Sequence, residues 1–149
     1  PHILNPVNTP KFSMPRIILG AFLLSLAVLP ACTRTERPDA RVVVTTASCD
    51  QLLKESTKPI VLDFWAPWCG PCKKMDPIFA EAALERPDVV FGKVNVDQEP
   101  ELARKYEVRA IPTLVVLVDG KVVNTSVGFV AKPALLELVD AALEKKPQP

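Results

Sequence analysis

The chain has 149 residues, of which 48% are hydrophobic and 23% are charged. This length corresponds to one domain of ordinary size preceded by a leader, and the hydrophobic content can build a core without disulfide staples. Lysine and arginine total 18 against 17 acidic residues. Because the charges are so balanced, nothing indicates nucleic acid or a charged membrane surface as an electrostatic partner, and we expect no binding to nucleic acid.

The first 31 residues have the pattern of a leader that exports the protein. Residues 1–13 show no periodicity and do not begin with Met, so we expect Met14 to be the natural start. Arg16 then supplies a positive charge, and residues 17–29 form an apolar run. This run is too short for a comfortable membrane span but suits the core of a signal peptide.

The apolar run ends in Leu29-Pro30-Ala31-Cys32, which resembles the cleavage site of bacterial lipoproteins. The resemblance implies cleavage before Cys32 and attachment of lipid to it, although Pro30 departs from the small or β-branched residue usual there. The alternatives are an ordinary cleaved signal peptide with an incidental Cys32, and an uncleaved membrane anchor. All three export the domain, and residues 32–40 then form a tether to it.

Two cysteines separated by two residues stand between a strand pattern and a helix pattern. Residues 60–65 lack polar and apolar alternation, which predicts a strand covered on both faces. Residues 71–84 predict a helix, with Pro71 in the first turn, where no backbone donor is needed. Cys69 therefore lies at a helix N-terminus, where the positive end of the helix favours a thiolate. We expect Cys69 to be exposed and Cys72 to be shielded.

A single Cys-x-x-Cys can also be half of a structural zinc site. Such a site needs four ligands. The only histidine is His2, and the remaining cysteines, Cys32 and Cys49, have no partner at ligand spacing. We therefore favour thiol–disulfide exchange and expect no metal. Cys49 is predicted to be a small buried hydrophobe rather than a regulatory thiol.

Asp63 interrupts the apolar run of the strand before the motif. A carboxylate there is costly unless it is paired or protonated, and desolvation should raise its pKa. Two interpretations stay open. Asp63 can form a structural ion pair, for which Lys93 on a neighbouring strand is the candidate, or it can be a proton acceptor behind Cys72.

The other elements can be predicted from periodicity and turn residues. A β-branched run should form the first strand, and Ser48 can cap the helix that follows. Asp119-Gly120 is a strong signal for a two-residue hairpin turn. The elements expected outside the motif are a strand at 42–45, a helix from 48 to about 54, a strand at 89–96, a short helix opening at Glu99-Pro100, strands at 113–118 and 121–127, and a helix at 132–146.

The sequence Trp68-Cys69-Gly70-Pro71-Cys72 is similar to the active-site motif of the thioredoxin family. The order of predicted elements resembles a complete thioredoxin fold over residues 41–146, an α/β domain with a mixed five-stranded sheet flanked by four helices. Further matches are spread through that length: Asp63, Phe64, Trp65, Pro77, Lys93, Asp97, Ile111, Pro112, Thr113, Gly120 and Gly128.

The resemblance implies that Pro112 is cis and lies beside the cysteines. It also implies a shallow apolar surface that receives a substrate peptide. The residues assigned to substrate binding are Trp68, Gly70, Pro71, Ile111, Pro112 and Gly128. Phe129 departs from the small residue common after that glycine, so we expect a narrower or more apolar groove.

The function expected is that of an exported, lipid-anchored thiol–disulfide oxidoreductase that reduces protein disulfides. Cys69 attacks the substrate, Cys72 resolves the mixed disulfide, and Asp63 takes up the proton from Cys72. No cofactor is implied, and we expect a monomer that receives electrons from a membrane protein. The alternatives are a disulfide oxidase or isomerase with the same cysteines, and a non-catalytic binding module, against which the intact motif argues.

Overall fold

Residues 39–145 are the part of the chain that the computed structural model describes, and they contain nine helices and strands. In chain order these are β1 (Val42–Val43), α1 (Thr46–Glu55), β2 (Ile60–Trp65), α2 (Gly70–Glu85), β3 (Val90–Asn95), α3 (Pro100–Lys105), β4 (Thr113–Val118), β5 (Lys121–Val127) and α4 (Lys132–Glu144). The predicted leader, its start at Met14, Cys32 and nearly all of the predicted tether lie outside the described residues.

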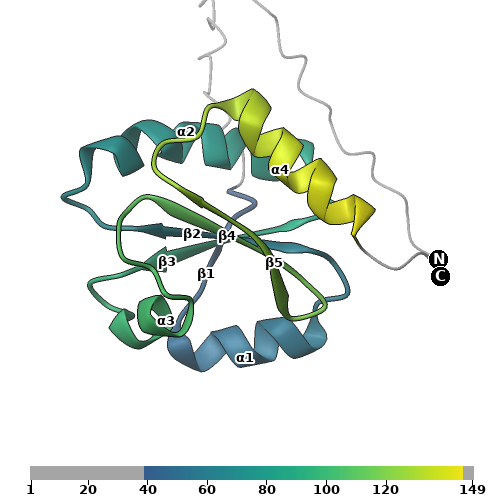
Figure 1. Cartoon of the computed structure of the whole chain (residues 1–149), viewed down its shortest axis with the longest axis horizontal. Coiled ribbons are helices and arrows are strands. Elements are labelled where there is room, and N and C mark those ends of the chain that lie inside the picture. Colours follow the sequence, from purple (N-terminus) through teal and green to yellow (C-terminus); the bar gives the residue numbers. More distant parts are fainter. Residues whose placement is uncertain (1–38, 146–149) are drawn as a thin grey trace, which may run out of the picture. The chain divides into compact units, whose positions relative to one another are not determined.

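The five strands form one mixed sheet in the order β1-β3-β2-β4-β5. Strands β1, β3 and β2 are parallel, whereas β4 is antiparallel to both β2 and β5. Figure 1 shows α2 and α4 on one face of the sheet and α1 and α3 on the other. The uninterrupted apolar run of β2 is explained by its central place, because both of its faces are covered. The predicted fold is confirmed.

Two hydrophobic cores lie on the two faces of the sheet. Val61 packs with Met75 and Phe79 of α2, whereas Leu62 packs in the cluster that contains residues of α1 and α3. Successive residues of a strand point to opposite faces, so Asp63 shares the face of Val61 and points toward α2. The strand therefore places this carboxyl behind the helix that begins at the cysteine motif.

The start of α1 differs from the prediction that Ser48 is its cap. Thr45 is the N-cap: its hydroxyl accepts a hydrogen bond from the Ser48 backbone N–H at 3.2 Å, and the Ser48 hydroxyl accepts one from the Thr45 N–H at 2.9 Å. This reciprocal arrangement is a capping box. Because Thr45 caps α1, it is not part of the first strand. Strand β1 ends at Val43, two residues before the predicted end.

The hairpin between β4 and β5 is confirmed. Asp119 and Gly120 have positive φ angles of 50° and 73°, the conformation that a tight two-residue hairpin turn requires. In the part of the chain that is described, none of the helices has the length and apolar character needed to cross a membrane.

Candidate active site

The two cysteines of the motif form a disulfide at the N-terminus of α2. Cys69 is the N-cap residue, and its sulfur accepts a hydrogen bond from the Cys72 backbone N–H at 3.2 Å. Pro71 lies in the first turn, as predicted. After reduction, a negative charge on the Cys69 sulfur would face both this N–H group and the positive end of the helix, and both favour the thiolate.

The prediction that Cys69 is exposed is wrong for the oxidised pair. Cys69 is 5% exposed and Cys72 is 2% exposed, so both sulfurs lie below the surface. They form a small buried cluster with Ala66, against which Trp65 and Ile111 pack. The two cysteines therefore differ by their positions on the helix rather than by their exposure, because only Cys69 occupies the N-cap.

The loop before β4 lies against this cluster, as the resemblance implied. The Ile111–Pro112 peptide bond is cis, and Ile111 packs against the cysteine cluster. The Pro112 carbonyl oxygen accepts a hydrogen bond from the Gly128 N–H at 2.7 Å. Gly128 has a φ angle of 96°, which a residue with a side chain rarely adopts. The structure thus joins the predicted Ile111, Pro112 and Gly128 at one site.

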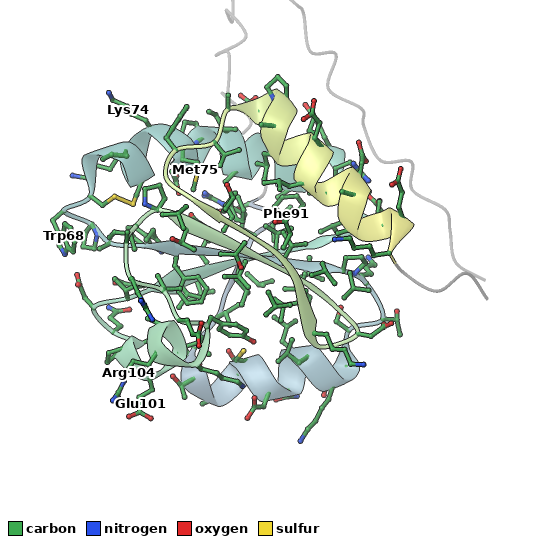
Figure 2. The ribbon with its side chains drawn as sticks, viewed as in Figure 1. Trp68, Lys74, Met75, Phe91, Glu101 and Arg104 are labelled. Atoms are coloured by element: carbon green, nitrogen blue, oxygen red, sulfur yellow. A yellow bond between two sulfur atoms is a disulfide. The ribbon has the colours of Figure 1, made fainter. Side chains whose placement is uncertain are left out.

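An exposed tryptophan lies next to the disulfide. Trp68 is 68% exposed, and its indole N–H donates hydrogen bonds to the Asp97 carboxylate at 3.0 and 3.2 Å. Figure 2 shows Trp68 and the yellow sulfur–sulfur bond at the same end of the molecule. Trp68 also lines a mostly apolar hollow with Ile111 and residues from α3 and the loop after it. Of the residues predicted to bind substrate, Trp68 and Ile111 line this hollow.

Phe129 enlarges this apolar surface on the opposite flank of the motif. Its side chain is 51% exposed and lines a second hollow with Pro71 and Lys74. An exposed aromatic ring beside the first turn of α2 is an apolar contact that a substrate peptide can use.

Asp63 is fully buried, and neither of its carboxyl oxygens has a hydrogen-bond partner among the described residues. The nearest cation is Lys93, whose Nζ lies 3.8 Å from the Asp63 Oδ2 atom. Burial raises the pKa of Asp63 to about 6, although the positive charge of Lys93 opposes this rise. The carboxyl group thus titrates close to neutrality.

The chain also matches known proteins over the same residues. The family model described as Thioredoxin matches residues 40–141, which include the cysteine motif, the cis proline and Asp63. The chain belongs to the thioredoxin family.

Individual thioredoxins are similar to this chain over a stretch of comparable length. Thioredoxin of Bacillus subtilis (strain 168) is 47% identical over 104 residues, which cover 68% of this chain and 100% of that protein. Thioredoxin of Mycoplasmoides gallisepticum is 45% identical over 97 residues, covering 65% of this chain and 96% of that protein. The X-ray structure of Fasciola hepatica thioredoxin superimposes with a TM-score of 0.64 at 42% identity, covering 68% of this chain and 98% of the other. The chain is therefore a thiol–disulfide oxidoreductase.

Cys49 lies away from the motif. It is 1% exposed in the core between the sheet and α1, and its sulfur is 3.7 Å from the Tyr106 hydroxyl oxygen. The prediction of a buried hydrophobe is confirmed.

Two charged residues near Asp63 were missed in the sequence. Asp76 accepts hydrogen bonds from both Lys93 and Arg41. Asp76 lies four residues after Cys72, and residues at this spacing share one side of a helix. The side of α2 that carries Cys72 was expected to face Asp63. The four-residue spacing is therefore a signal that could have placed Asp76 near the buried carboxyl. Arg41 gave no such signal, because it precedes the first strand in an irregular segment.

Proposed function

We propose that this protein reduces protein disulfides outside the cytoplasm, with Cys69 as the attacking thiol and Cys72 as the resolving thiol. The observation that carries the proposal is the N-cap position of Cys69, whose sulfur accepts the Cys72 backbone N–H. A thiolate is the nucleophile in disulfide exchange, and a helix N-terminus lowers the pKa of a cysteine placed there.

The reaction is a two-electron exchange between two disulfides. The Cys69 thiolate attacks one sulfur of the substrate disulfide, and the other substrate sulfur leaves as a thiolate. Cys72 then loses its proton and attacks the Cys69 sulfur, which releases the second substrate thiolate and leaves the Cys69–Cys72 disulfide. The substrate gains two electrons and two protons, and the cysteine pair is oxidised.

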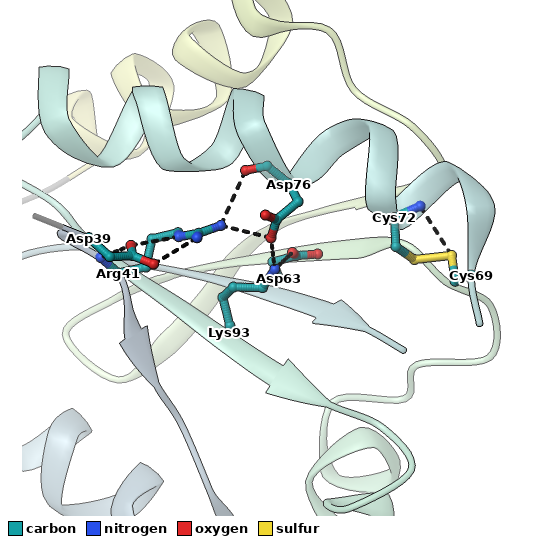
Figure 3. A network of polar contacts seen from close by, with 7 residues as sticks. All are labelled: Asp39, Arg41, Asp63, Cys69, Cys72, Asp76 and Lys93. Carbon is teal, nitrogen blue, oxygen red and sulfur yellow. Dashed lines mark hydrogen bonds and ion pairs between the residues drawn. A yellow bond between two sulfur atoms is a disulfide. The ribbon is translucent and has the colours of Figure 1, made fainter. Parts of the chain in front are cut away.

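Asp63 is proposed as the acceptor of the Cys72 proton. It lies on the face of β2 that points toward α2, the helix that carries Cys72 (Figure 3). A pKa of about 6 leaves the carboxylate ionised at neutral pH while keeping it a better base than an ordinary aspartate. Its lack of hydrogen-bond partners among the described residues leaves both oxygens available for the proton.

The surface around the motif is suited to a peptide segment of the substrate. Trp68 and Phe129 are exposed on two flanks of the disulfide, and Ile111 and Pro112 close the site from the loop before β4. Such a surface can hold an extended apolar segment while the substrate disulfide meets Cys69. We infer that the substrates are protein disulfides rather than small disulfides, because this apolar area adds binding energy only for a larger partner.

The direction of electron flow follows from the residues between the cysteines. Gly70 has no side chain and Pro71 has no N–H, so neither adds a donor that would stabilise the thiolate further. The helix terminus therefore lowers the pKa of the Cys69 thiol without further help, and we expect a reduction potential close to the value of about −270 mV known for thioredoxin. We expect a value below about −220 mV in a titration against glutathione or dithiothreitol. A value above about −180 mV would instead identify a disulfide oxidase or isomerase.

Export of the protein is proposed from the apolar leader and Cys32. Mass spectrometry of the membrane fraction should find a mature N-terminus at Cys32 that carries acyl chains. A soluble product that begins elsewhere would contradict the lipid anchor but would leave export open. An exported reductase also needs a source of electrons, and we propose a membrane protein that reduces the Cys69–Cys72 disulfide with its own dithiol.

A further inference from the structure

Lys93 lies between two carboxylates and donates its hydrogen bond to the outer one. Its Nζ donates to the Asp76 Oδ1 atom, whereas the Asp63 Oδ2 atom is 3.8 Å away, beyond the length of a normal hydrogen bond. Figure 3 shows Lys93 directed at both carboxylates and joined to Asp76. The Nζ also lies 4.4 Å from the centre of the Trp65 ring, which favours a cation at this place.

Asp76 is held in position by a second cation. The Arg41 guanidinium donates to the Asp76 Oδ1 atom at 2.7 Å and to the Asp76 carbonyl oxygen at 3.2 Å. Arg41 is fixed in turn by Asp39, with its Nη2 atom 2.7 Å from the Asp39 Oδ2 atom. Burial opposes ionisation of Asp76, but the hydrogen bond from Lys93 and the charges of Lys93 and Arg41 outweigh it and lower its pKa. Asp76 is therefore a fixed anion.

We propose that Asp76 is a positioning residue of the active site: it holds the Lys93 ammonium beyond hydrogen-bond distance of Asp63 and so leaves the Asp63 oxygens free to accept a proton. This inference rests on the role proposed above for Asp63 in the disulfide reaction.

A small displacement of Lys93 is enough to change the state of Asp63. Without the Asp76 carboxylate, a shift of about 1 Å would bring the Nζ atom within hydrogen-bond distance of the Asp63 Oδ2 atom. Both are otherwise poorly solvated, since the side chains are 0% exposed in Asp63 and 12% exposed in Lys93. A direct ion pair would stabilise the charged form of Asp63 and lower its affinity for a proton.

The charged and titratable groups around Asp63 come from three segments. Lys93 faces it from β3, Asp76 from α2, and Arg41 from the segment before β1. On the other side, the residue of β4 paired with Asp63 is the uncharged Leu114. The charge of Asp76 raises the pKa of Asp63, and that of Arg41 lowers it. Removal of the Asp76 charge therefore lowers the pKa of Asp63 directly, and a closer approach of Lys93 to Asp63 would lower it as well.

A double-mutant cycle separates the direct charge effect from positioning through Lys93. The pKa of Asp63 would be measured by carbon-13 NMR titration in the full chain, as wild type, Asp76→Asn, Lys93→Gln and the double variant. We expect Asp76→Asn to lower the pKa of Asp63 by about one unit when Lys93 is present. In the Lys93→Gln background the same change should lower it by less than half as much.

The control variant also removes one negative charge from α2, but at a position that does not contact Lys93. Glu85→Gln, on the same helix, removes a carboxylate that pairs with Lys132 instead, and should leave the pKa of Asp63 unchanged. The Asp76 side chain is 41% exposed, so substitution should be tolerated, and Asp76→Ala is a second variant that suits a helix. The proposal is overturned if the pKa of Asp63 does not fall, or falls equally with and without Lys93.

The kinetic readout tests the step in which Cys72 loses its proton. In single-turnover measurements of the resolving attack by Cys72, the lower pH midpoint should move down in Asp76→Asn by the same amount as the pKa of Asp63, because this step requires the proton acceptor. A midpoint that stays in place while the pKa falls would overturn the role of Asp76 in the reaction. A wild-type protein that reduces no disulfide would contradict the proposed function instead, since the NMR titration needs no activity.

Discussion

Asp63 and Lys93 occupy paired positions on the parallel strands β2 and β3, yet the lysine donates its hydrogen bond to Asp76. The sheet thus brings a cation close to the buried carboxyl, while the helix above it keeps the two from full contact. A carboxylate left in this state is costly for the fold and useful as a base. The effect of Asp63 on the stability of the fold and its effect on the reaction rate can be measured separately.

Asp63→Asn should stabilise the protein at neutral and alkaline pH. Burial raises the pKa of Asp63 from its ordinary 3.8 to about 6 in the folded protein, so the folded state binds the proton more tightly than the unfolded chain. Stability is therefore fully present below about pH 4 and is lost as the pH rises through 6. A difference of about two pKa units corresponds to about 3 kcal/mol, an upper limit because the new amide is also buried.

Chemical denaturation of the oxidised wild type and Asp63→Asn at about pH 4 and about pH 7.5 tests this pH dependence. The variant should gain stability relative to the wild type only at the higher pH, and its rate of insulin reduction should fall. The opposite pattern, with lost stability and an unchanged rate per molecule, would show that Asp63 forms a structural ion pair with Lys93.

The two cysteines should differ in their ability to trap substrates. In Cys72→Ser the Cys69 thiolate can attack a substrate, but no thiol remains to resolve the mixed disulfide, which should accumulate. In Cys69→Ser the remaining Cys72 lies inside the first turn, away from the N-cap, and should trap almost nothing. Non-reducing electrophoresis followed by mass spectrometry of trapped partners would show this, and equal trapping by both variants would refute the assignment.

Gly92→Ala should destabilise the fold through the sheet face covered by α1. A Cβ atom at Gly92 would lie 2.7 Å from a methyl carbon of Val44 and 2.8 Å from one of Leu62, closer than such atoms approach. Overpacking of this kind costs about 1–3 kcal/mol. Gly70→Ala is the matched control for stability, since a Cβ there has no neighbour within 4 Å. Equal denaturant midpoints for the two variants would contradict the predicted destabilisation by Gly92→Ala.

Most of the fold could be predicted because its signals are local and agree with one another. The apolar run of β2, the Asp119-Gly120 turn and Pro71 beside Cys69 each specify a structure that the neighbouring elements also require. The cap of α1 was misplaced by three residues because Thr45 and Ser48 both suit an N-cap. Only the reciprocal hydrogen bonds between them show which residue caps the helix and which lies within it.

The site was predicted less completely, because burial and charge positions depend on the packed structure. Nothing local in the motif shows that Cys69 is covered, since Ile111 covers it from a loop about forty residues away in sequence. Lys93 was correctly placed near Asp63 by strand pairing. That its hydrogen bond goes to Asp76 rather than to Asp63 depends on how α2 packs on the sheet and on Arg41, which holds Asp76 from an irregular segment.

Phe129 should contribute to the recognition of protein substrates and not to the exchange chemistry itself. Its ring is 51% exposed beside Pro71 and makes no part of the buried cysteine cluster. A substrate segment that covers the exposed half of the ring would gain about 1 kcal/mol, or about five-fold in affinity. Phe129→Ala should therefore lower kcat/KM for the reduction of insulin disulfides about five-fold, chiefly through KM.

The same variant should reduce a small aromatic disulfide at the wild-type rate, because such a substrate reaches the sulfurs without crossing the ring. Val122→Ala is the matched control: this side chain on β5 is also half exposed, at 50%, but pairs with Leu117 at the end of the hairpin far from Pro112. It should change neither assay. Equal losses for the protein and the small substrate in Phe129→Ala would place the ring in the reaction itself, since a change in substrate docking alone cannot slow both.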